Sequence, residues 1–412
     1  MADNPQEFDW LLMDSTNKKD LSTFPQPWRV VWLLAIGSFA VGTGLFALSG
    51  VLPLMAASLH VPVAVAGQSV TVFAVTYAVV APILASFASR WPTRPFLLIA
   101  LGIFTVGNTL SAFATSLEFL MVTRIIAAVG AAAFSPVALG AAAAIVPEAK
   151  RGQALAIVMS GLNAALAAGV PLGVALASIS SWQSAVLVVT GLGVVAIAVI
   201  AIGVPKLPQG QQTSLKRMLG IMRFAPVTRV LVVTTLLIAA GISAYAYVAP
   251  LVQSTVGATG TVFIVLLVIY GVGAFAGSLG SGVLTDRVGA RRALTGTVSM
   301  LVVVLLLLPN VHVLWGGMIL LFLWGGLFVA NTTPQQHRLV SLVPYEPTVV
   351  VSLNSSAIYV GQAIGAACGG AFLAVGVDSS KLPYLAAGLA LCALILHVIS
   401  TRPMPHIESA QA

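Results

Sequence analysis

The sequence predicts an all-α membrane protein, with twelve transmembrane helices arranged as two pseudo-symmetric six-helix bundles. Three observations lead to this fold class: charge is scarce, apolar runs are long, and the two halves of the chain correspond. Only 7% of the 412 residues are Asp, Glu, Lys or Arg, against about 25% in an average soluble domain. Hydrophobic residues make up 59%, and the mean hydropathy is +1.04. This composition excludes a soluble enzyme, a disordered chain and a disulfide-stapled secreted protein, and the unbroken runs disfavour a transmembrane barrel.

A transmembrane helix needs about 20 predominantly apolar residues, and the chain divides into twelve such runs. The expected spans are residues 30–52, 66–88, 95–114, 119–145, 153–177, 184–204, 228–251, 261–284, 293–309, 313–337, 348–374 and 383–400. The long polar break after the sixth span divides the chain in two. We therefore expect an N-terminal tail (1–28), an N-terminal bundle (29–204), a linker (205–227), a C-terminal bundle (228–401) and a C-terminal tail (402–412).

The distribution of Lys and Arg predicts the orientation of the spans. An even number of spans places both termini on one side. With both termini in the cytoplasm, cytoplasmic segments and their helix ends hold 17 of the 19 Lys and Arg; Lys381 falls outside and Arg124 falls within a span. Because positive charge marks the cytoplasmic side, we expect cytoplasmic termini and a cytoplasmic linker, and we attribute the net charge of +8 to this bias and not to nucleic acid.

The two halves of the chain show an internal repeat. Adding 197 to the position of Pro53, at the end of the first span, gives Pro250, at the end of the seventh. The same offset relates Pro147 to Pro344, after the fourth and tenth spans. Agreement in one register predicts two homologous six-helix halves, an arrangement in which transporters place the substrate near the midplane.

The break after the eighth span carries a specific motif. It reads Gly282-Val-Leu-Thr-Asp286-Arg287-Val-Gly289-Ala-Arg291-Arg292-Ala-Leu294. This resembles the GxLaDRxGRRxxL signature of the major facilitator superfamily, and it implies the major facilitator fold. In physical terms, Gly282 allows close helix approach, Asp286 accepts hydrogen bonds or pairs with an Arg, and Gly289 makes a tight turn. Arg291 and Arg292 anchor at lipid headgroups.

The first-half copy of this motif is degraded. Arg90 and Arg94 remain, but Ser89 stands where the family has Asp and Pro92 where it has the turn Gly. In the family this copy helps to lock one conformational state, so the resemblance implies a weaker or different lock here.

The fifth span narrows the resemblance. Gly161, Gly169, Pro171 and Gly173 are similar to the gating Gly/Pro motif of the twelve-helix drug:proton antiporters. With stretches in spans 7, 10 and 11, the chain resembles the branch that contains arabinose/sugar, purine and chloramphenicol efflux transporters. This implies a monomeric, multi-pass protein of the bacterial inner membrane.

Ionisable residues inside the membrane are functional candidates. No Asp or Glu lies well inside an expected span, and Leu45 occupies the place where relatives often carry an acid. Arg124 lies about six residues, or roughly 9 Å, from the outer end of the fourth span. It either binds an anionic substrate group or modulates a proton site, or it extends to the outer headgroups or caps a neighbouring helix end.

The expected substrate cavity is neutral, polar and aromatic. Such side chains must find partners inside a bundle, and the partner is a substrate or a neighbouring helix. We expect about half of the candidates to line the cavity; with Arg124, they are Thr43, Phe46, Phe73, Tyr77, Phe134, Asn163, Tyr245, Tyr247, Trp324, Asn354 and Tyr359.

The sequence thus predicts a secondary active transporter and not an enzyme. We expect export of a small neutral or amphipathic molecule of the drug, sugar or nucleobase class by alternating access, with protons as the coupling ion. The missing acid motivates a first alternative, a non-coupled facilitator or exchanger. The degraded first motif motivates a second, a non-transporting receptor or scaffold. No cofactor or metal motif is present in the sequence, and the expected partners are the substrate, protons and the lipid bilayer.

Overall fold

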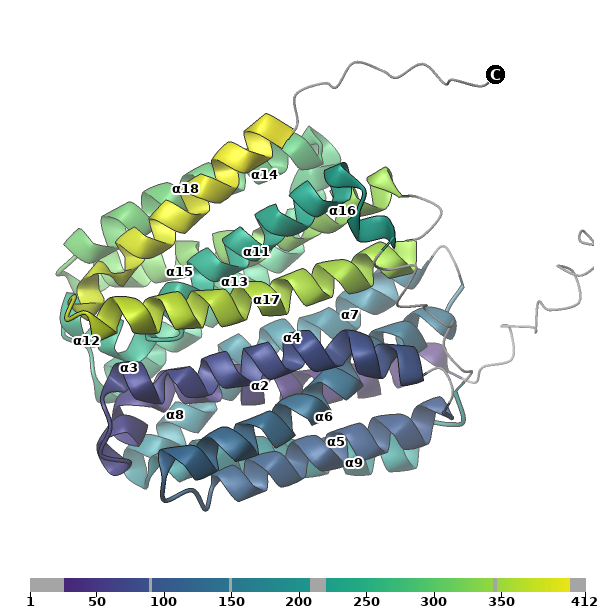
Figure 1. Cartoon of the computed structure of the whole chain (residues 1–412), viewed down its shortest axis with the longest axis horizontal. Helices are drawn as coiled ribbons and strands as arrows, with labels where there is room; N and C mark the ends of the chain where they lie inside the picture. Colours follow the sequence, from purple (N-terminus) through teal and green to yellow (C-terminus); the bar gives the residue numbers. More distant parts are fainter. Residues whose placement is uncertain (1–25, 89–90, 148–149, 208–219, 344–346, 401–412) are drawn as a thin grey trace, which may run out of the picture.

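The computed structural model describes residues 26–88, 91–147, 150–207, 220–343 and 347–400, where all regular structure is helical (Figure 1). The expected tails at 1–28 and 402–412 and the expected linker at 205–227 lie wholly or mostly outside these residues, as does Arg90. Twelve helical segments in the described part are long and apolar enough to cross a membrane, which confirms the expected number of spans.

Each half contributes six of these segments. The first six are α2 (Pro27–Ser58), α3 with α4 (Val63–Ala66, Gln68–Ala88), α5 (Thr93–Ser111), α6 (Leu117–Ala144), α7 with η3 and α8 (Arg151–Ala164, Ala165–Gly169, Val170–Ile179), and α9 (Trp182–Gly203). The second six are α11 with α12 (Ala225–Tyr245, Val248–Val256), α13 (Gly260–Val288), α14 with η4 (Ala290–Leu307, Leu308–Asn310), α15 with α16 (Leu314–Ala330, Thr332–Leu342), α17 (Pro347–Ala374), and η5 with α18 (Ser379–Lys381, Leu382–Ser400).

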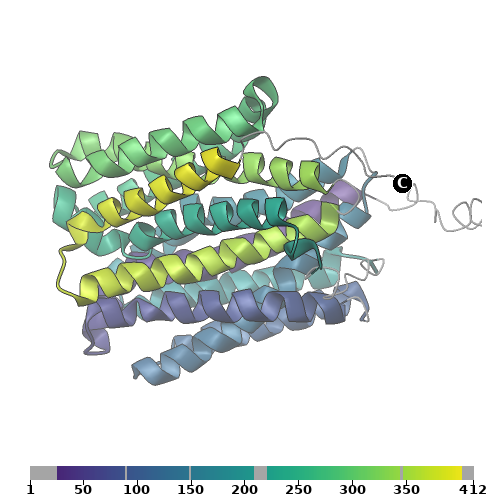
Figure 2. The same cartoon turned by 45° about the horizontal axis from the view of Figure 1, so that its top comes forward.

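The two halves form two bundles that lie side by side, with α2–α9 below and α11–α18 above in Figures 1 and 2. They meet where α4 packs against α17, where α13 packs against α7, η3 and α8, and where α12 packs against α2. Since twelve passes are an even number, α18 ends on the side where α2 begins, which we call the terminal face. The opposite face, at the left of Figure 1, holds α3 and α12.

Burial separates central from peripheral helices. In the most apolar stretch of each span, 72% of residues are buried in α2 and 67% in α11, against 33% in α9. The outer surface is strongly apolar, with side chains such as Ile202 and Ile179 at 86% and 80% exposure. Lipid tails are as apolar as these side chains, so their exposure is stable in a bilayer. The innermost helices of the two halves are therefore α2 and α11.

Several spans differ from the continuous runs that the sequence predicts. The first helix continues through Pro53 to Ser58 instead of ending near it, because a membrane bundle tolerates the one lost backbone hydrogen bond. The seventh span breaks at Ala246–Tyr247, and the tenth breaks at Asn331. Discontinuous helices are common at the binding sites of transporters, and hydropathy is blind to them because the breaks carry no charge.

Close helix packing in the second half depends on small residues in α13 and α15. A Cβ on Gly273 would collide with the backbone of Phe322, and one on Gly277 would collide with that of Gly326. Small residues allow such backbone approach in membrane bundles. This contact replaces the one expected at Gly282, where a Cβ would meet open space.

We therefore expect Gly273→Val to lower the apparent Tm of the detergent-solubilised protein by roughly 5 °C, because the added carbons must push α13 and α15 apart. Differential scanning fluorimetry measures this. Gly191→Val on α9 is the matched control, since that glycine is exposed and a Cβ there would meet nothing. Equal effects of the two substitutions would contradict the packing role of Gly273.

Candidate functional site

Four aromatic side chains meet at the middle of the molecule and join the two bundles. Phe46 of α2 contacts Tyr245 of α11 edge to face, with ring centroids 5.7 Å apart. Tyr245 stacks on Tyr270 of α13 at 4.7 Å, and both rings meet Trp324 of α15 edge to face, at 6.3 and 5.2 Å. We call these four residues the aromatic cluster. All four are buried, so the cluster closes the centre of the bundle.

The aromatic cluster carries polar atoms without partners. In the described part of the chain, nothing hydrogen-bonds to the hydroxyl groups of Tyr245 and Tyr270 or to the indole Nε1 of Trp324. Leaving a buried donor unsatisfied costs about 1–3 kcal/mol. Three such atoms in one cluster leave unused hydrogen-bonding capacity at the contact between the bundles.

A second aromatic contact joins the bundles between α4 and α17. The rings of Tyr77 and Tyr359 stack with centroids 3.3 Å apart, and Ser135 of α6 hydrogen-bonds to both hydroxyl groups. Unlike the aromatic cluster, this pair has its polar atoms satisfied within the protein. It is a contact between halves that must break when the halves separate along this seam.

Arg124 lies inside the first bundle, 1% exposed. Its Nη2 donates to the backbone oxygen of Gly44 at 2.9 Å, and its Nη1 donates to Asn108 Oδ1 at 3.4 Å. The guanidinium also lies 4.4 Å from the ring centroid of Phe73. The alternative that this side chain reaches the outer headgroups is wrong, because the α2 and α5 acceptors hold it inward. Among the described residues no carboxylate pairs with it, so its charge is balanced only by dipoles and a ring face.

The other predicted cavity residues lie in the first bundle, in the second bundle, or at the contact between the two. Thr43 packs at Gly169, and Phe134 packs at Gly37, both inside the first bundle. Asn163 bridges the bundles by donating to Ser278 Oγ at 3.3 Å. The remaining two lie in the second bundle: Tyr247 donates to the backbone oxygen of Ala366 at 3.1 Å, and Asn354 accepts from Thr234 at 3.0 Å.

The glycines of the fifth span serve close packing around an irregular turn. A Cβ on Gly161 would collide with the backbone of Ala35, and one on Gly169 with Thr43, whereas Gly173 meets Ala185 at ordinary distance. Between them η3 is a π-helical turn, and Pro171 opens α8 after it. Such turns are frequent at functional sites, and this one lies where α13 crosses from the other bundle.

The motif after α13 lies at the terminal face. Gly289 adopts a left-handed conformation with φ of 82° between α13 and α14, as the expected tight turn requires. Asp286, Arg287, Arg291 and Arg292 are exposed, and no ion pair to Asp286 occurs among the described residues. Of the first-half copy, Arg94 donates to the backbone oxygen of Ala201 and so ties α5 to α9.

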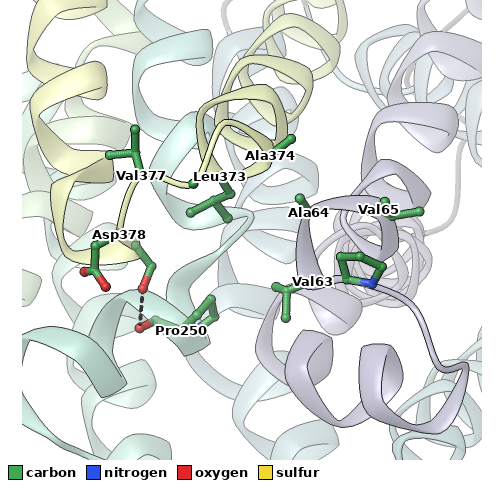
Figure 3. Close-up of a pocket in the computed structure, with 11 residues that line it drawn as sticks. Val63, Ala64, Val65, Pro250, Leu373, Ala374, Val377 and Asp378 are labelled. Carbon is green, nitrogen blue, oxygen red and sulfur yellow. Dashed lines mark hydrogen bonds between the residues drawn. The ribbon is translucent and has the colours of Figure 1, made fainter.

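A pocket of about 600 Å³ opens on the opposite face, between α3 of the first bundle and the ends of α12 and α17 (Figure 3). Its wall is mostly apolar, with Pro62, Val63 and Leu373 among the lining residues. Asp378 lies at its edge, and hydrogen bonds from Ser380 hold the pKa of this carboxyl below its usual value. The pocket therefore presents an ionised group beside an apolar wall at the junction of the halves.

Sequence reasoning missed two parts of this site. Tyr270 belongs to the aromatic cluster, and Ser135 belongs to the Tyr77–Tyr359 contact. Both lie in apolar spans, where the hydroxyl group of the side chain is the sequence signal that points to them. No group of three His, Cys, Asp or Glu suited to a metal is found among the described residues.

Comparison with known proteins agrees with this architecture. The sequence model of the Major Facilitator Superfamily matches residues 34–366 and 231–411. The inner membrane transport protein YdhP of Escherichia coli strain K12 is 33% identical over 373 residues, 90% of this chain and 96% of that protein. A chloramphenicol resistance protein of Streptomyces lividans is 32% identical over 345 residues, 81% of this chain and 86% of that protein.

A solved structure shows the same fold. It is a bacterial homologue of the human lysosomal transporter Spinster, in an inward-facing and unoccupied conformation. The two chains superpose with a TM-score of 0.67 at 15% identity, covering 92% of this chain and 96% of the other. At this identity the likeness establishes the fold alone.

The burial of Arg124 without a carboxylate partner among the described residues leads to a prediction. Because an unpaired buried cation is costly, we expect Arg124→Met to leave the apparent Tm unchanged or to raise it by a few degrees, roughly up to 5 °C, while transport is lost. Arg223→Met, on the exposed segment before α11, is the control for both measurements. A fall in Tm of several degrees would instead assign Arg124 to holding α2, α5 and α6 together.

Proposed function

The chain belongs to the Major Facilitator Superfamily, and on that premise we propose that it exports a small neutral aromatic molecule across the bacterial inner membrane in exchange for protons. The observation that carries this proposal is the aromatic cluster, in which rings from both bundles meet and three polar atoms lack partners. A site that both halves share is the place where binding can be linked to their relative movement.

The chemistry of the aromatic cluster favours a neutral, planar substrate. Ring faces and edges stabilise another ring by stacking. Trp324 Nε1 can only donate, and the hydroxyl groups of Tyr245 and Tyr270 can donate or accept. A substrate that carries oxygen acceptors, such as carbonyl, nitro or hydroxyl groups on an aromatic frame, satisfies all three atoms. The cluster itself contains no ionisable group with a charge at neutral pH, so it offers nothing to balance a charged substrate.

Alternating access follows from the contacts between the bundles. Phe46–Tyr245 and Tyr77–Tyr359 are ring contacts between different halves, and they separate when the halves rock apart. A substrate ring that inserts beside Tyr245 replaces the contact with Phe46. The binding energy of the substrate thus replaces the energy of a contact between the halves. A bound substrate therefore lowers the free-energy cost of the conformational change.

The direction of transport rests on charge and on the relatives. Arg and Lys gather at the terminal face, which supports a cytoplasmic location for that face. The pocket beside Asp378 then lies at the outer mouth, where an exported molecule leaves. The name of the Streptomyces lividans relative, a chloramphenicol resistance protein, supports efflux, and that of YdhP supports the inner membrane.

A second candidate function is an uncoupled facilitator or exchanger. It is favoured by Leu45, a buried apolar side chain at the position where related antiporters often carry an acid. The resemblance of the fifth span to drug:proton antiporters favours proton exchange, which we retain as the first choice.

The hydroxyl groups of Tyr245 and Tyr270, which lack partners, lead to a prediction about both thermal stability and substrate affinity. We expect Tyr245→Phe and Tyr270→Phe to leave the apparent Tm equal or higher, because each removes an unsatisfied buried group. Chloramphenicol, used as the first probe in a susceptibility and uptake panel of drugs, sugars and nucleobases, identifies a transported compound. For that compound each substitution should weaken apparent affinity by about 3–10-fold, the value of one hydrogen bond. Tyr384→Phe, on the exposed face of α18, is the control, and unchanged affinity in both cluster variants would place the substrate elsewhere.

Proteoliposomes decide between the two candidate functions. With the compound found in the panel, an imposed pH gradient should drive accumulation against its concentration gradient if protons are exchanged. Collapse of the pH gradient with a protonophore is the control. Flux that depends on the substrate gradient alone would establish the facilitator or exchanger.

A further inference from the structure

A continuous hydrogen-bonded network crosses the second bundle toward the terminal face. At its inner end, Thr234 of α11 donates to Asn354 Oδ1 of α17 at 3.0 Å. Gln335 of α16 donates through Nε2 to Thr234 Oγ1 at 3.1 Å. All three residues are buried, so the network links three helices away from lipid and bulk water.

The network continues from Gln335 to a buried histidine. Arg338 donates through Nη1 to Gln335 Oε1 at 3.1 Å, and the same Nη1 lies 2.8 Å from Nδ1 of His397 on α18. The other ring nitrogen, Nε2, lies 3.1 Å from Thr295 Oγ1 and 3.3 Å from the backbone oxygen of Arg291 on α14. His397 is 0% exposed. Three helices, α14, α16 and α18, are therefore joined at one imidazole ring.

The partners fix the charge and tautomer of His397. Arginine is a donor and keeps its proton, so Nδ1 must accept from Arg338, and the proton of the neutral ring sits on Nε2. A proton added to Nδ1 uses the lone pair with which the ring accepts this bond. Protonation of His397 and the contact with Arg338 therefore exclude each other.

The charges around the ring strengthen this exclusion. Arg338 of α16 and Arg291 of α14 both act on it as cations. Two other long helices, α11 and α17, also pack against α18. The first carries Arg229 near its start, and the second carries no Asp, Glu, Lys, Arg or His in its sequence. Among the described residues the charged neighbours of His397 are thus cations, and an imidazolium must displace Arg338 instead of joining it.

Arg338 bonds the terminal end of α16 to α18. The helix α16 is separated from α15 by the break at Asn331, and its buried Leu339 packs into an apolar core with residues of α11 and α17. Gln335 bonds α16 to α11, and Arg338 bonds it to His397 and Ser400 of α18. Release of Arg338 therefore frees the terminal end of the tenth span from α18.

The inner end of the network also adjoins a small polar cavity. It measures about 10 Å³ and is lined by Thr234, Asn331, Gln335 and Asn354, among others. This is about the space of one water molecule, and Asn354 Nδ2 is buried there without a protein partner in the described chain. Rearrangement of Gln335 therefore reaches a second polar site near the middle of the bundle.

We propose that His397 is a proton-binding site of this carrier, and that proton binding there displaces Arg338 and frees the terminal end of α16. This rests on the proposed transport function, for which it supplies a titratable group that the spans lack as Asp or Glu. A proton from hydronium in the bulk water adds to the Nδ1 lone pair and leaves a water molecule behind, Arg338 moves away from the ring, and the change passes through Gln335 to Thr234 and Asn354. Proton binding is thereby linked to the mobility of the tenth span at the terminal face.

The test measures conformation without substrate. Spin labels on Gly140→Cys of α6 and Ser341→Cys of α16, both exposed positions, report the separation of the two bundles at the terminal face by pulsed electron resonance, with the two native cysteines replaced by Ser. The full chain in liposomes is measured from about pH 3.5 to about pH 8, a range that extends below the usual titration of histidine because the cations Arg338 and Arg291 oppose an imidazolium at this position. We expect the label separation to change with pH, and His397→Gln to abolish this change. His337→Gln, on the exposed side of α16 one residue from Arg338, should retain it.

Two further variants protect the test against a folding defect of His397→Gln. Arg338→Met keeps the histidine but removes the group that the proton displaces, so the separation should no longer depend on pH. Gln335→Leu keeps both residues and should shift the midpoint by about one pH unit, because it removes the bond that orients Arg338. A separation that is constant with pH in the parent, or a pH response that survives in His397→Gln, overturns the proposal. The measurement uses no substrate. Its result therefore does not depend on whether the transport assays succeed.

Discussion

The bilayer offers no hydrogen-bonding partner, so every polar atom inside this molecule must be satisfied by the protein or by what the protein carries. The two bundles meet this constraint differently. The first holds the buried charge of Arg124 against a backbone oxygen, an amide and a ring. The second distributes neutral amides and hydroxyls into a network that ends at Arg338 and His397. At the contact between the bundles, three polar atoms of the aromatic cluster lie together without partners among the described residues.

This contrast gives each region a different kind of rigidity. A buried hydrogen-bonded network is costly to break and fixes the relative position of its helices. The aromatic cluster, whose polar hydrogens lack partners, is held by packing alone. Its ring contacts can therefore be replaced by equivalent contacts with a bound substrate. The molecule is thus stiffer within each bundle than where the bundles meet, as rocking of the two halves requires.

The sequence alone predicted the class, the number of spans and the family, because apolar runs and a charged motif are local signals. It also named Phe46, Tyr245 and Trp324, which do meet. It could not predict that Tyr270 joins them or that Arg124 turns inward, because such contacts depend on helix rotation, and helices that are apolar on all sides give no periodicity to read. Helix breaks such as the one at Asn331 could not be predicted for a related reason, because a hydropathy average does not resolve the one or two residues at which a helix is interrupted.

The π-helical turn η3 changes how the fifth span must be read. A π turn holds more residues than an α turn, and each extra residue offsets the helix by about 100° at 3.6 residues per turn. The positions before Ala165 and after Gly169 are therefore out of phase. Asn163 faces α13 and Gly173 faces α9, although no single helical wheel relates them. In any member of this fold with such a turn, substitutions on the two sides should be assigned to faces with two separate wheels.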